Sequence, residues 1–579
     1  MSPRRAILAA VAAFLAVNVL FLGARPVLTA DETRYGSIAA QMVERGDWLA
    51  LQMSGFKFYE KPPLVTWMMA ASIELFGHTG FAIRLPMALC GGLAALAVAV
   101  GARRGAMLAG RARDEATVTG ALVALCALTM VLPAVGASVA ILDMPIAAFT
   151  VSAAVAVFMA ATGPAGRVRL GWLAVAGVMA GLAFMTKGLL ALVFPAMAVA
   201  PWLMWERRWR DLFVLPWVPL AVGALVVLPW ALAVSRAEPG FWHRFIVHEH
   251  IQRFLGTGSN QPTEPMAFYL LVVPLGAVPW IVTLPMAARR WPALARGSAG
   301  IRFAACAVLG PLLFLSLSRG KLPTYSLPVF PPLAWLLVEG VLAAFAAMPA
   351  RAARAAAFVP GAVLVVLGLS AFVLSLAGDA SGALLSHAWL DAPHAHAAVL
   401  GAVLVLWGAG DWLAQRAPAG PRRLAWMGLS PVAALASFGL LFPDAALSDA
   451  LASGRTVEAA RATLCGTGTL FCDQKLAHAS AWFLDREDFL VIDAPREFRT
   501  GLDRPEDDAR LVTDGEFPAR LAAARTHGSA CVAAATHIVD RLTAWPGVPA
   551  PIKRTDHRGW ALVEFAPASA PCASPSVRR

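Results

Sequence analysis

The stretch "FAIRLPMALCGGLAALAVAVGARR" (residues 81–104) decides the fold class, because it carries no charged residue between Arg84 and Arg103. A helix needs about 20 apolar residues to cross ~30 Å of hydrocarbon, and basic residues at one end are typical of the cytoplasmic side. Runs of this kind recur up to residue 443, in a chain that is 59% hydrophobic and 15% charged. The sequence therefore predicts a polytopic α-helical membrane protein.

About thirteen transmembrane spans fit the pattern of apolar runs. We expect them at 6–24, 82–102, 117–135, 144–162, 170–186, 188–205, 212–234, 266–288, 302–318, 325–347, 356–377, 396–414 and 424–442. Threading these spans puts the basic clusters of the loops on the side of the N-terminus: Arg103, Arg104, Arg111 and Arg113, then Arg167 and Arg169, then Arg207, Arg208 and Arg210, then Arg289, Arg290 and Arg296, then Arg351 and Arg354, then Arg416, Arg422 and Arg423. The positive-inside rule therefore supports this topology.

The net charge of +12 also follows from these clusters, so it indicates membrane topology and contact with anionic lipid rather than nucleic-acid binding.

Residues 1–30 have the layout of a signal peptide, ending in small residues at Ala30. Their apolar run is long enough to span a membrane. We interpret it as an uncleaved first helix with Arg4 and Arg5 in the cytoplasm.

The composition changes at about residue 443, where polar and acidic residues return. Short β-like runs, "LFCDQ", "FLVID", "ACVAAA" and "WALVEFA", alternate with Ala/Arg-rich helical stretches such as 517–526. We predict a transmembrane domain at 1–443, with a first outer loop at 25–81, and a small soluble α/β domain at 444–579 on the outer side. Four cysteines would be able to form disulfides there, namely Cys465, Cys472, Cys531 and Cys572.

Two charged residues lie in almost purely apolar sequence: Asp143 in "ASVAILDMPIAAF" and Lys187 in "LAFMTKGLLALVF". A charge in the bilayer interior costs about 2.5–3.5 kcal/mol on insertion scales, so such residues usually face a cavity or a partner. The alternative is a side chain at a helix end that reaches the headgroups, and it remains open for both residues.

The first outer loop is rich in polar residues. "DETRYGSIAAQMVERGDWL" (31–49) predicts a helix along the membrane surface with Asp31 as its cap, although a plain amphipathic connector would show the same pattern. "FKFYEKPPLVTW" (56–67) then sets Glu60 and Lys61 before Pro62 and Pro63, which exclude helix there and favour an extended backbone.

Two further segments carry polar residues on the predicted outer side. "FWHRFIVHEHIQRFLG" (241–256) interleaves arginines with aromatic residues, a combination that suits a phosphate attached to a lipid. His248 and His250 together with Glu60 are candidate ligands of a divalent cation, although their spacing is not diagnostic. "SRGKLPTYSLPVFPP" (318–332) places Lys321 and Tyr325 in a proline-bounded turn.

Taken in chain order, "DETRYGSIAAQMVERGDWL", "GFKFYEKPPLVTW", "ILDMP", "TKG", "HEHIQRF" and "GKLPTYSLPVFPPLA" resemble the bacterial aminoarabinose transferases that modify lipid A. These enzymes belong to the protein O-mannosyltransferase-like, GT-C group of membrane glycosyltransferases. The resemblance covers the membrane part, and the C-terminal domain matches in position and kind only. It implies a GT-C fold and transfer of 4-amino-4-deoxy-L-arabinose from undecaprenyl phosphate to a lipid A phosphate, at the periplasmic face of the inner membrane.

The resemblance also implies roles for individual residues. It implies that Asp31 and Asp143 are catalytic and that the phosphate of the donor lipid is bound by Lys61, Arg253, Tyr325 and Arg34. Lys187, Lys321 and Tyr59 are further candidates, and Glu60, His248 and His250 are the candidate metal ligands. The resemblance implies that no cofactor is required, although a bound divalent metal ion is compatible with it. We expect the protein to be a monomer.

The chemistry of such a transfer agrees with these roles. Charge grows on the departing lipid phosphate, so cations placed in advance would stabilise the transition state. A phosphate acceptor needs little help from a base, whereas a hydroxyl acceptor would make Asp31 the natural base. Two alternatives remain: the same mechanism with a hexuronic acid, a hexose or a protein acceptor, and a transporter of polyprenyl-linked sugars. The gathering of charges on one face, without a visible half-repeat, favours the enzyme.

Overall fold

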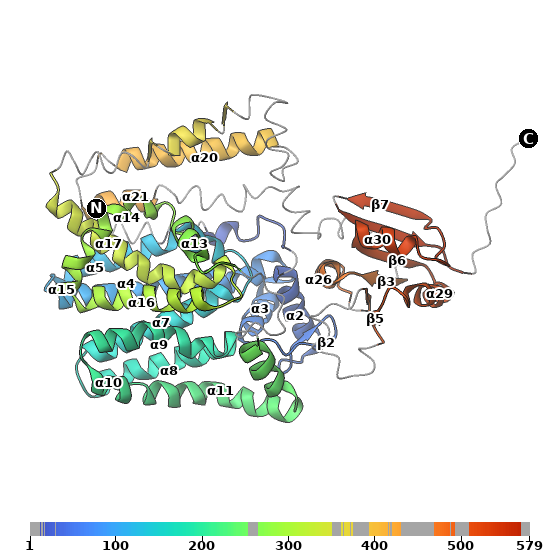
Figure 1. Cartoon of the computed structure of the whole chain (residues 1–579), viewed down its shortest axis with the longest axis horizontal. Coiled ribbons are helices and arrows are strands. Elements are labelled where there is room, and N and C mark those ends of the chain that lie inside the picture. Colours follow the sequence, from blue (N-terminus) through green and yellow to red (C-terminus); the bar gives the residue numbers. More distant parts are fainter. Residues whose placement is uncertain are drawn as a thin grey trace, which may run out of the picture. The chain divides into compact units, whose positions relative to one another are not determined.

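The computed structural model describes residues 12, 16, 18–28, 31–252, 264–349, 361–362, 364–370, 372–373, 393–414, 416, 420–429, 468–486, 488–492, 509–557 and 559–568. The chain forms two compact units (Figure 1). The helical unit comprises residues 1–25, 60–388 and 392–442, and the α/β unit comprises residues 26–59, 389–391 and 443–579. The first outer loop up to residue 59 therefore groups with the C-terminal segment.

The helical unit confirms the prediction of a polytopic helical protein. Within the described residues, six helices are long and apolar enough to cross a membrane, at Gly80–Leu108 (α4), Asp143–Thr162 (α7), Arg167–Lys187 (α8), Trp209–Ala237 (α10 and α11), Ala299–Leu317 (α16) and Pro323–Ala347 (η3 and α17). A bent pair, Phe268–Gly276 (α13) and Trp280–Ala288 (η2 and α14), makes up to seven. The predicted number of thirteen is not confirmed. The spans predicted at 6–24, 356–377 and 424–442 lie wholly or partly outside the described residues.

Further helices complete this unit. They are Leu64–Phe76 (α3), Arg113–Leu128 (α5), Val131–Gly136 (α6), Leu190–Trp205 (α9), Trp291–Gly297 (α15), Pro393–Ala414 (α20) and Pro421–Leu429 (α21). A π-helix, η1, covers His243–Gln252. The helix α3 starts directly after Pro63, whose carbonyl accepts a hydrogen bond from the Thr66 hydroxyl at 2.8 Å.

Two predicted spans are interrupted. The run 117–135 splits into α5 and α6 at Thr129 and Met130, and the Thr129 hydroxyl accepts a hydrogen bond from the Trp280 indole at 2.9 Å. The run 266–288 bends by 102° between α13 and η2. Pro133 and Pro279 lie at these breaks, and proline lacks the amide hydrogen that continuous helix requires. Hydropathy registers apolar length and not such bends, which explains why both runs were predicted as single spans.

Glycines allow the closest helix contacts. A Cβ at Gly177 of α8 would lie 2.6 Å from the Cβ of Val222 on α11 (Trp217–Ala237), and one at Gly181 would lie 2.7 Å from the Cβ of Val226. Small residues four positions apart let two helices approach closely within a membrane. The helices α8 and α11 consequently lie side by side (Figure 1).

The α/β unit contains a six-stranded sheet in the order β5-β4-β3-β6-β8-β7. Its strands are Thr469–Cys472 (β3), Leu490–Ile492 (β4), Leu511–Val512 (β5), Ala530–Ala535 (β6), Lys553–His557 (β7) and Trp560–Phe565 (β8). The first four positions in the order are parallel, and β8 pairs antiparallel with both β6 and β7. The four predicted strand runs and the helix near 517–526, observed as Phe517–His527 (α29), are confirmed.

The same unit contains the helix of the first outer loop, Asp31–Arg45 (α2), and a small hairpin of Gln52–Met53 (β1) and Phe56–Lys57 (β2). The helix α2 packs against Gln474–Phe483 (α26). A helix in the predicted stretch 31–49 is thus confirmed, although it ends at Arg45, and its position along the membrane surface stays a prediction. Cys531 is disulfide-bonded, whereas Cys472 is a buried free thiol, so Cys465 and Cys472 are not linked to each other.

Candidate active site

An ion pair between Asp143 and Lys187 lies at the centre of the candidate site. Asp143 is the first residue of α7 and Lys187 is the last residue of α8, and a short loop joins the other ends of these two helices. A negative charge at a helix N-terminus and a positive charge at a C-terminus are both favourable to the helix dipole. The Asp143 residue is only 7% exposed, so this pair is largely shielded from solvent.

The turn after Lys187 explains the "TKG" motif. Gly188 has φ 67° and ψ −131°, a backbone conformation that side-chain-bearing residues avoid, and its amide donates to the Phe184 carbonyl at 2.8 Å. Glycine at this position ends α8 directly after Lys187. The ammonium group is therefore held at the helix end and reaches Asp143.

The turn before α17 (Phe330–Ala347) supplies two more side chains. The Thr324 hydroxyl donates to Asp143 Oδ2 at 2.8 Å, and the Lys187 ammonium lies 4.6 Å from the centroid of the Tyr325 ring. Both residues belong to the 3-10 helix η3, Pro323–Val329, which begins with proline and contains Pro328. Each oxygen of the Asp143 carboxylate therefore has a partner.

Lys61 forms the second charged group of the site. Its ammonium donates to Glu249 Oε2 of η1 and to the Glu60 carbonyl, both at 2.9 Å, and Glu60 Oε2 lies 4.0 Å away. Two carboxylates thus compete for one cation. Glu249 was not among the predicted site residues, because nothing in its polar surroundings distinguishes it from a surface charge.

These groups line one cavity of about 160 Å³. Its walls include three carboxylates, those of Glu60, Asp143 and Glu249, together with two lysines and the Tyr325 ring, and the apolar neighbours are Ile146, Leu190, Phe194 and Phe314. Cations beside an apolar wall can hold the phosphate of a lipid, and a carboxylate can orient or deprotonate a second reactant. Of the predicted site residues, Asp143, Lys61, Tyr325, Lys187 and Glu60 are brought together here. Thr324 was missed, because a neutral hydroxyl in a polar turn has no large desolvation cost that would mark it in the sequence as a functional residue.

The other predicted residues lie in different surroundings. Lys321 is 3% exposed, and its ammonium donates to the carbonyls of Glu264 and Ser318. In the α/β unit, Asp31 at the start of α2 pairs with Arg34, and Tyr59 is buried with the Lys57 ammonium 5.8 Å from its ring centroid. Arg253 lies outside the described residues, as does the side chain of His250.

The candidate metal ligands do not form a cluster in the described part of the chain. Nowhere in it do three His, Cys, Asp or Glu side chains converge as a metal ion would require. The His248 ring is exposed and its Nδ1 lies 2.7 Å from Gln252 Oε1. A metal held by Glu60 and the two histidines stays a prediction.

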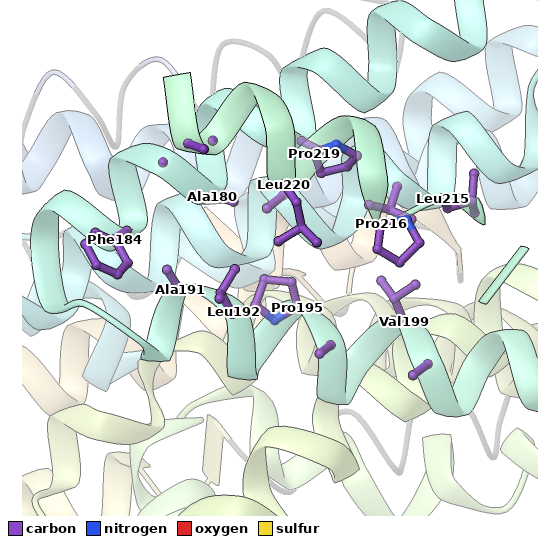
Figure 2. Close-up of a pocket in the computed structure, with 18 of the residues that line it drawn as sticks. Ala180, Phe184, Ala191, Leu192, Pro195, Val199, Leu215, Pro216, Pro219 and Leu220 are labelled. Carbon is purple, nitrogen blue, oxygen red and sulfur yellow. The ribbon is translucent and has the colours of Figure 1, made fainter. Parts of the chain in front are cut away.

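A larger cavity of about 440 Å³ lies between α7, α8, α9 and α11, and Figure 2 shows it lined by Ala, Leu, Pro, Val and Phe side chains. Phe184 and Ala191 belong to its wall, while Lys187 and Leu190 belong to the wall of the charged cavity. Both cavities therefore adjoin the α8–α9 junction, the apolar one along the helices and the charged one at their ends.

Two family models match the chain. Residues 5–245 match the family described as dolichyl-phosphate-mannose-protein mannosyltransferase. Residues 449–564 match the family described as arabinosyl transferase ArnT, C-terminal domain. The second match lies in the C-terminal part of the chain, which we predicted from its composition to be a soluble α/β domain.

Whole-chain comparisons extend these matches. The undecaprenyl phosphate-alpha-4-amino-4-deoxy-L-arabinose arabinosyl transferase of Aeromonas salmonicida is 32% identical over 531 residues, covering 89% of this chain and 91% of the relative. The Serratia proteamaculans protein of the same name is 32% identical over 519 residues, covering 89% and 90%. The crystal structure of ArnT from Cupriavidus metallidurans bound to undecaprenyl phosphate superposes with a TM-score of 0.78 at 23% identity, covering 96% of this chain and 97% of that one, which shows the same fold. The predicted family and GT-C fold are confirmed: this chain belongs to the undecaprenyl phosphate-aminoarabinose arabinosyl transferases.

Proposed function

We propose that this chain transfers 4-amino-4-deoxy-L-arabinose from undecaprenyl phosphate to a phosphate group of lipid A. The names of the relatives give the donor. The observation that carries the proposal is the charged cavity at the ends of α7 and α8, where Asp143, Lys187 and Lys61 lie beside the Tyr325 ring. A site that cleaves a lipid-linked sugar needs cations for the phosphate and a carboxylate near the sugar.

In this reaction the bond between the sugar and the undecaprenyl phosphate breaks, and the phosphate takes up the bonding electrons. Lys61 is assigned to this growing charge, together with Arg253, Arg34 and the Tyr325 hydroxyl. Cations already in place stabilise such a charge without reorganisation, which is often the largest contribution to catalysis. Asp143 and Asp31 are assigned to the sugar and the acceptor. A lipid A phosphate is already anionic, so these carboxylates would orient the reactants and steady positive charge on the sugar ring.

The apolar cavity of Figure 2 fits a hydrocarbon chain of one of the two lipid substrates. It extends along α8 and α9 and borders the same α8–α9 junction as the charged cavity, so a chain could lie among the helices while its phosphate reaches the charged groups. Burial of apolar chain is worth about 0.8 kcal/mol per CH₂ group. The cavity thus supports a lipid substrate over a soluble nucleotide sugar.

The reaction is assigned to the periplasmic face of the inner membrane, with residues 444–579 as a periplasmic domain. The support is the distribution of basic loops, which puts the α7–α8 end carrying Asp143 and Lys187 opposite the arginine clusters. An Ala237→Cys variant in an exposed position of the predicted outer loop and an Arg210→Cys variant in a predicted inner loop test this orientation. In intact cells, a membrane-impermeant thiol reagent should label the first and spare the second. The reverse pattern would overturn the orientation.

The activity itself is tested by mass spectrometry of lipid A from cells with and without the chain. The expected result is one aminopentose increment on lipid A phosphate that depends on the chain, and that is lost with Asp31→Asn and with Lys61→Ala. A lipid A profile that the chain leaves unchanged would refute the proposal. An increment of a hexose or a hexuronic acid would replace the sugar while keeping the mechanism.

A further inference from the structure

We propose that Arg510, in the C-terminal half of the α/β unit, is a positioning residue for the first outer loop. It fixes the β1–β2 hairpin, and the chain leaves this hairpin directly into Glu60 and Lys61. The inference rests on the proposed function, because it assigns Arg510 an effect on binding of the donor phosphate by Lys61. It also gives the C-terminal domain a task in the reaction.

The contact between Arg510 and the hairpin joins residues more than 450 positions apart in the sequence. The Arg510 guanidinium carbon lies 4.3 Å from the centroid of the Phe56 ring and 5.7 Å from that of Phe489. Nε and Nη2 of Arg510 donate to the Phe489 carbonyl at 3.4 and 3.3 Å. Phe56 and Phe489 are fully buried. A planar guanidinium can stack on an aromatic ring and bond sideways at the same time, which lysine cannot do.

The tip of the hairpin is shaped to admit this guanidinium. Ser54 and Gly55 form a two-residue turn with φ 53° and 82°, the left-handed conformation that tight hairpins require. A Cβ on Gly55 would lie 2.7 Å from Arg510 Nη1, closer than real contacts allow. Glycine at position 55 therefore serves both the turn and the close approach of Arg510.

The hairpin needs such external support. Its strands have two residues each, and isolated two-stranded hairpins are marginally stable at best. The ladder continues by one step beyond the strands, where the Phe58 amide donates to the Leu51 carbonyl at 2.9 Å. The Phe58 ring then meets Tyr35 of α2 edge-on, with centroids 6.4 Å apart. The C-terminal segment thus braces the loop at the hairpin, and again where α26 packs against α2.

The contact of Arg510 with the hairpin acts on Lys61 through the backbone that joins them. Only Phe58 and Tyr59, both buried, separate β2 from Glu60, and Pro62 and Pro63 restrict the backbone beyond Lys61. A hairpin held by Arg510 therefore leaves only this short link of chain before Glu60 and Lys61. Displacement of a substrate-positioning group by about 1 Å can cost about 100-fold in rate.

The test compares Arg510→Ala, Arg510→Lys and Gly55→Ala in the full-length purified protein, with Arg541→Ala as the matched control. Arg541 is an arginine of the same domain, paired with Asp514 in a partly exposed ion pair. The readouts are the dissociation constant of undecaprenyl phosphate, kcat and donor KM for the transfer, and the thermal midpoint. We expect Arg510→Ala and Gly55→Ala each to raise the dissociation constant and donor KM about tenfold, with a smaller effect on kcat. Arg510→Lys should lie between, and Arg541→Ala should match the wild type.

The double variant Gly55→Ala/Arg510→Ala should lose less than the sum of the two single variants, because both act on one contact, while the alanine keeps its separate strain at φ 82° in the turn. Wild-type donor binding and KM in folded Arg510→Ala would overturn the inference. If Arg510→Ala does not fold, Arg510→Lys decides in its place, and unaltered donor binding there refutes the proposal. Failure of the proposed function shows up differently, as absence of transfer by the wild type, and binding of undecaprenyl phosphate still separates the variants in that case.

Discussion

Asp143 and Lys187 form an ion pair that ties the first residue of α7 to the last residue of α8. Thr324 completes the arrangement from a third element by donating to the other carboxylate oxygen. Because each charge also lies at the helix end that favours it, the pair costs less than two isolated charges in the same position would. The site therefore holds a carboxylate paired with an ammonium group next to an apolar wall.

Removing one member of this pair should harm both folding and activity. In Asp143→Asn, the largely shielded Lys187 ammonium loses its ion pair with Asp143, and breaking a buried pair costs up to about 3–5 kcal/mol. We expect a lower thermal midpoint in detergent and a loss of transfer on the order of 100-fold. The two effects can be separated with Asp143→Asn/Lys187→Met, which removes both charges of the pair. This double variant should regain most of the thermal stability and remain inactive. An active double variant would show that the pair is only structural.

Thr324 should contribute less than the charges it accompanies. Thr324→Val keeps the shape of the side chain but removes the hydrogen bond to Asp143, a loss of about 1 kcal/mol. If the bond holds the carboxylate in its reactive orientation, kcat should fall about fivefold. Thr324→Ser retains the hydroxyl and should stay close to the wild type. Equal rates for the valine and serine variants would contradict a role for this hydrogen bond.

Asp143 and Lys187 could be identified from the sequence because each interrupts an apolar run, where a charge is costly. Thr324 and Glu249 could not, because their roles depend on pairings across 181 and 188 sequence positions. Four strands of the C-terminal domain were predicted from short β-like runs. The bend between α13 and η2 was not predicted, because hydropathy does not change there. The sequence therefore indicated the charges within apolar runs and the short strands. The hydrogen bond of Thr324, the ion pair of Glu249 and the bend between α13 and η2 depend on tertiary structure.

Glu249 should compete with the donor phosphate for Lys61. The Lys61 ammonium lies 2.9 Å from Glu249 Oε2, so a phosphate that binds Lys61 meets the negative charge of this carboxylate. Glu249→Gln removes the negative charge at almost unchanged volume, and partly shielded pairs of this kind are worth up to about 1 kcal/mol. We expect undecaprenyl phosphate to bind the purified variant about threefold to fivefold more tightly, whereas Lys61→Ala should weaken binding at least about tenfold. Weaker binding by Glu249→Gln would mean instead that Glu249 orients Lys61 for the phosphate.

The stability of the α/β unit should depend on pH through Glu44 at the end of α2. Burial raises the pKa of Glu44 above its ordinary 4.5, and the charge and hydrogen bond of Asp485 raise the pKa further, against a smaller opposing effect of Arg45. The folded state thus binds a proton more tightly than the unfolded chain does. The resulting stabilisation is fully present below the unfolded pKa and is lost as the pH rises through the folded pKa.

Glu44→Gln should abolish this dependence, because the amide can keep a hydrogen bond to Asp485 without titrating. We expect the thermal midpoint of the wild type, measured relative to Glu44→Gln, to decline as the pH is raised from about 4 to about 7. Asp485→Asn, which removes the neighbouring charge but leaves the burial of Glu44, should flatten the profile only in part. A constant difference between wild type and Glu44→Gln across this range would show that the two carboxyl groups do not share a proton. Because α2 carries Asp31, a pH-dependent loss of this contact should also lower transfer at the upper end of the range.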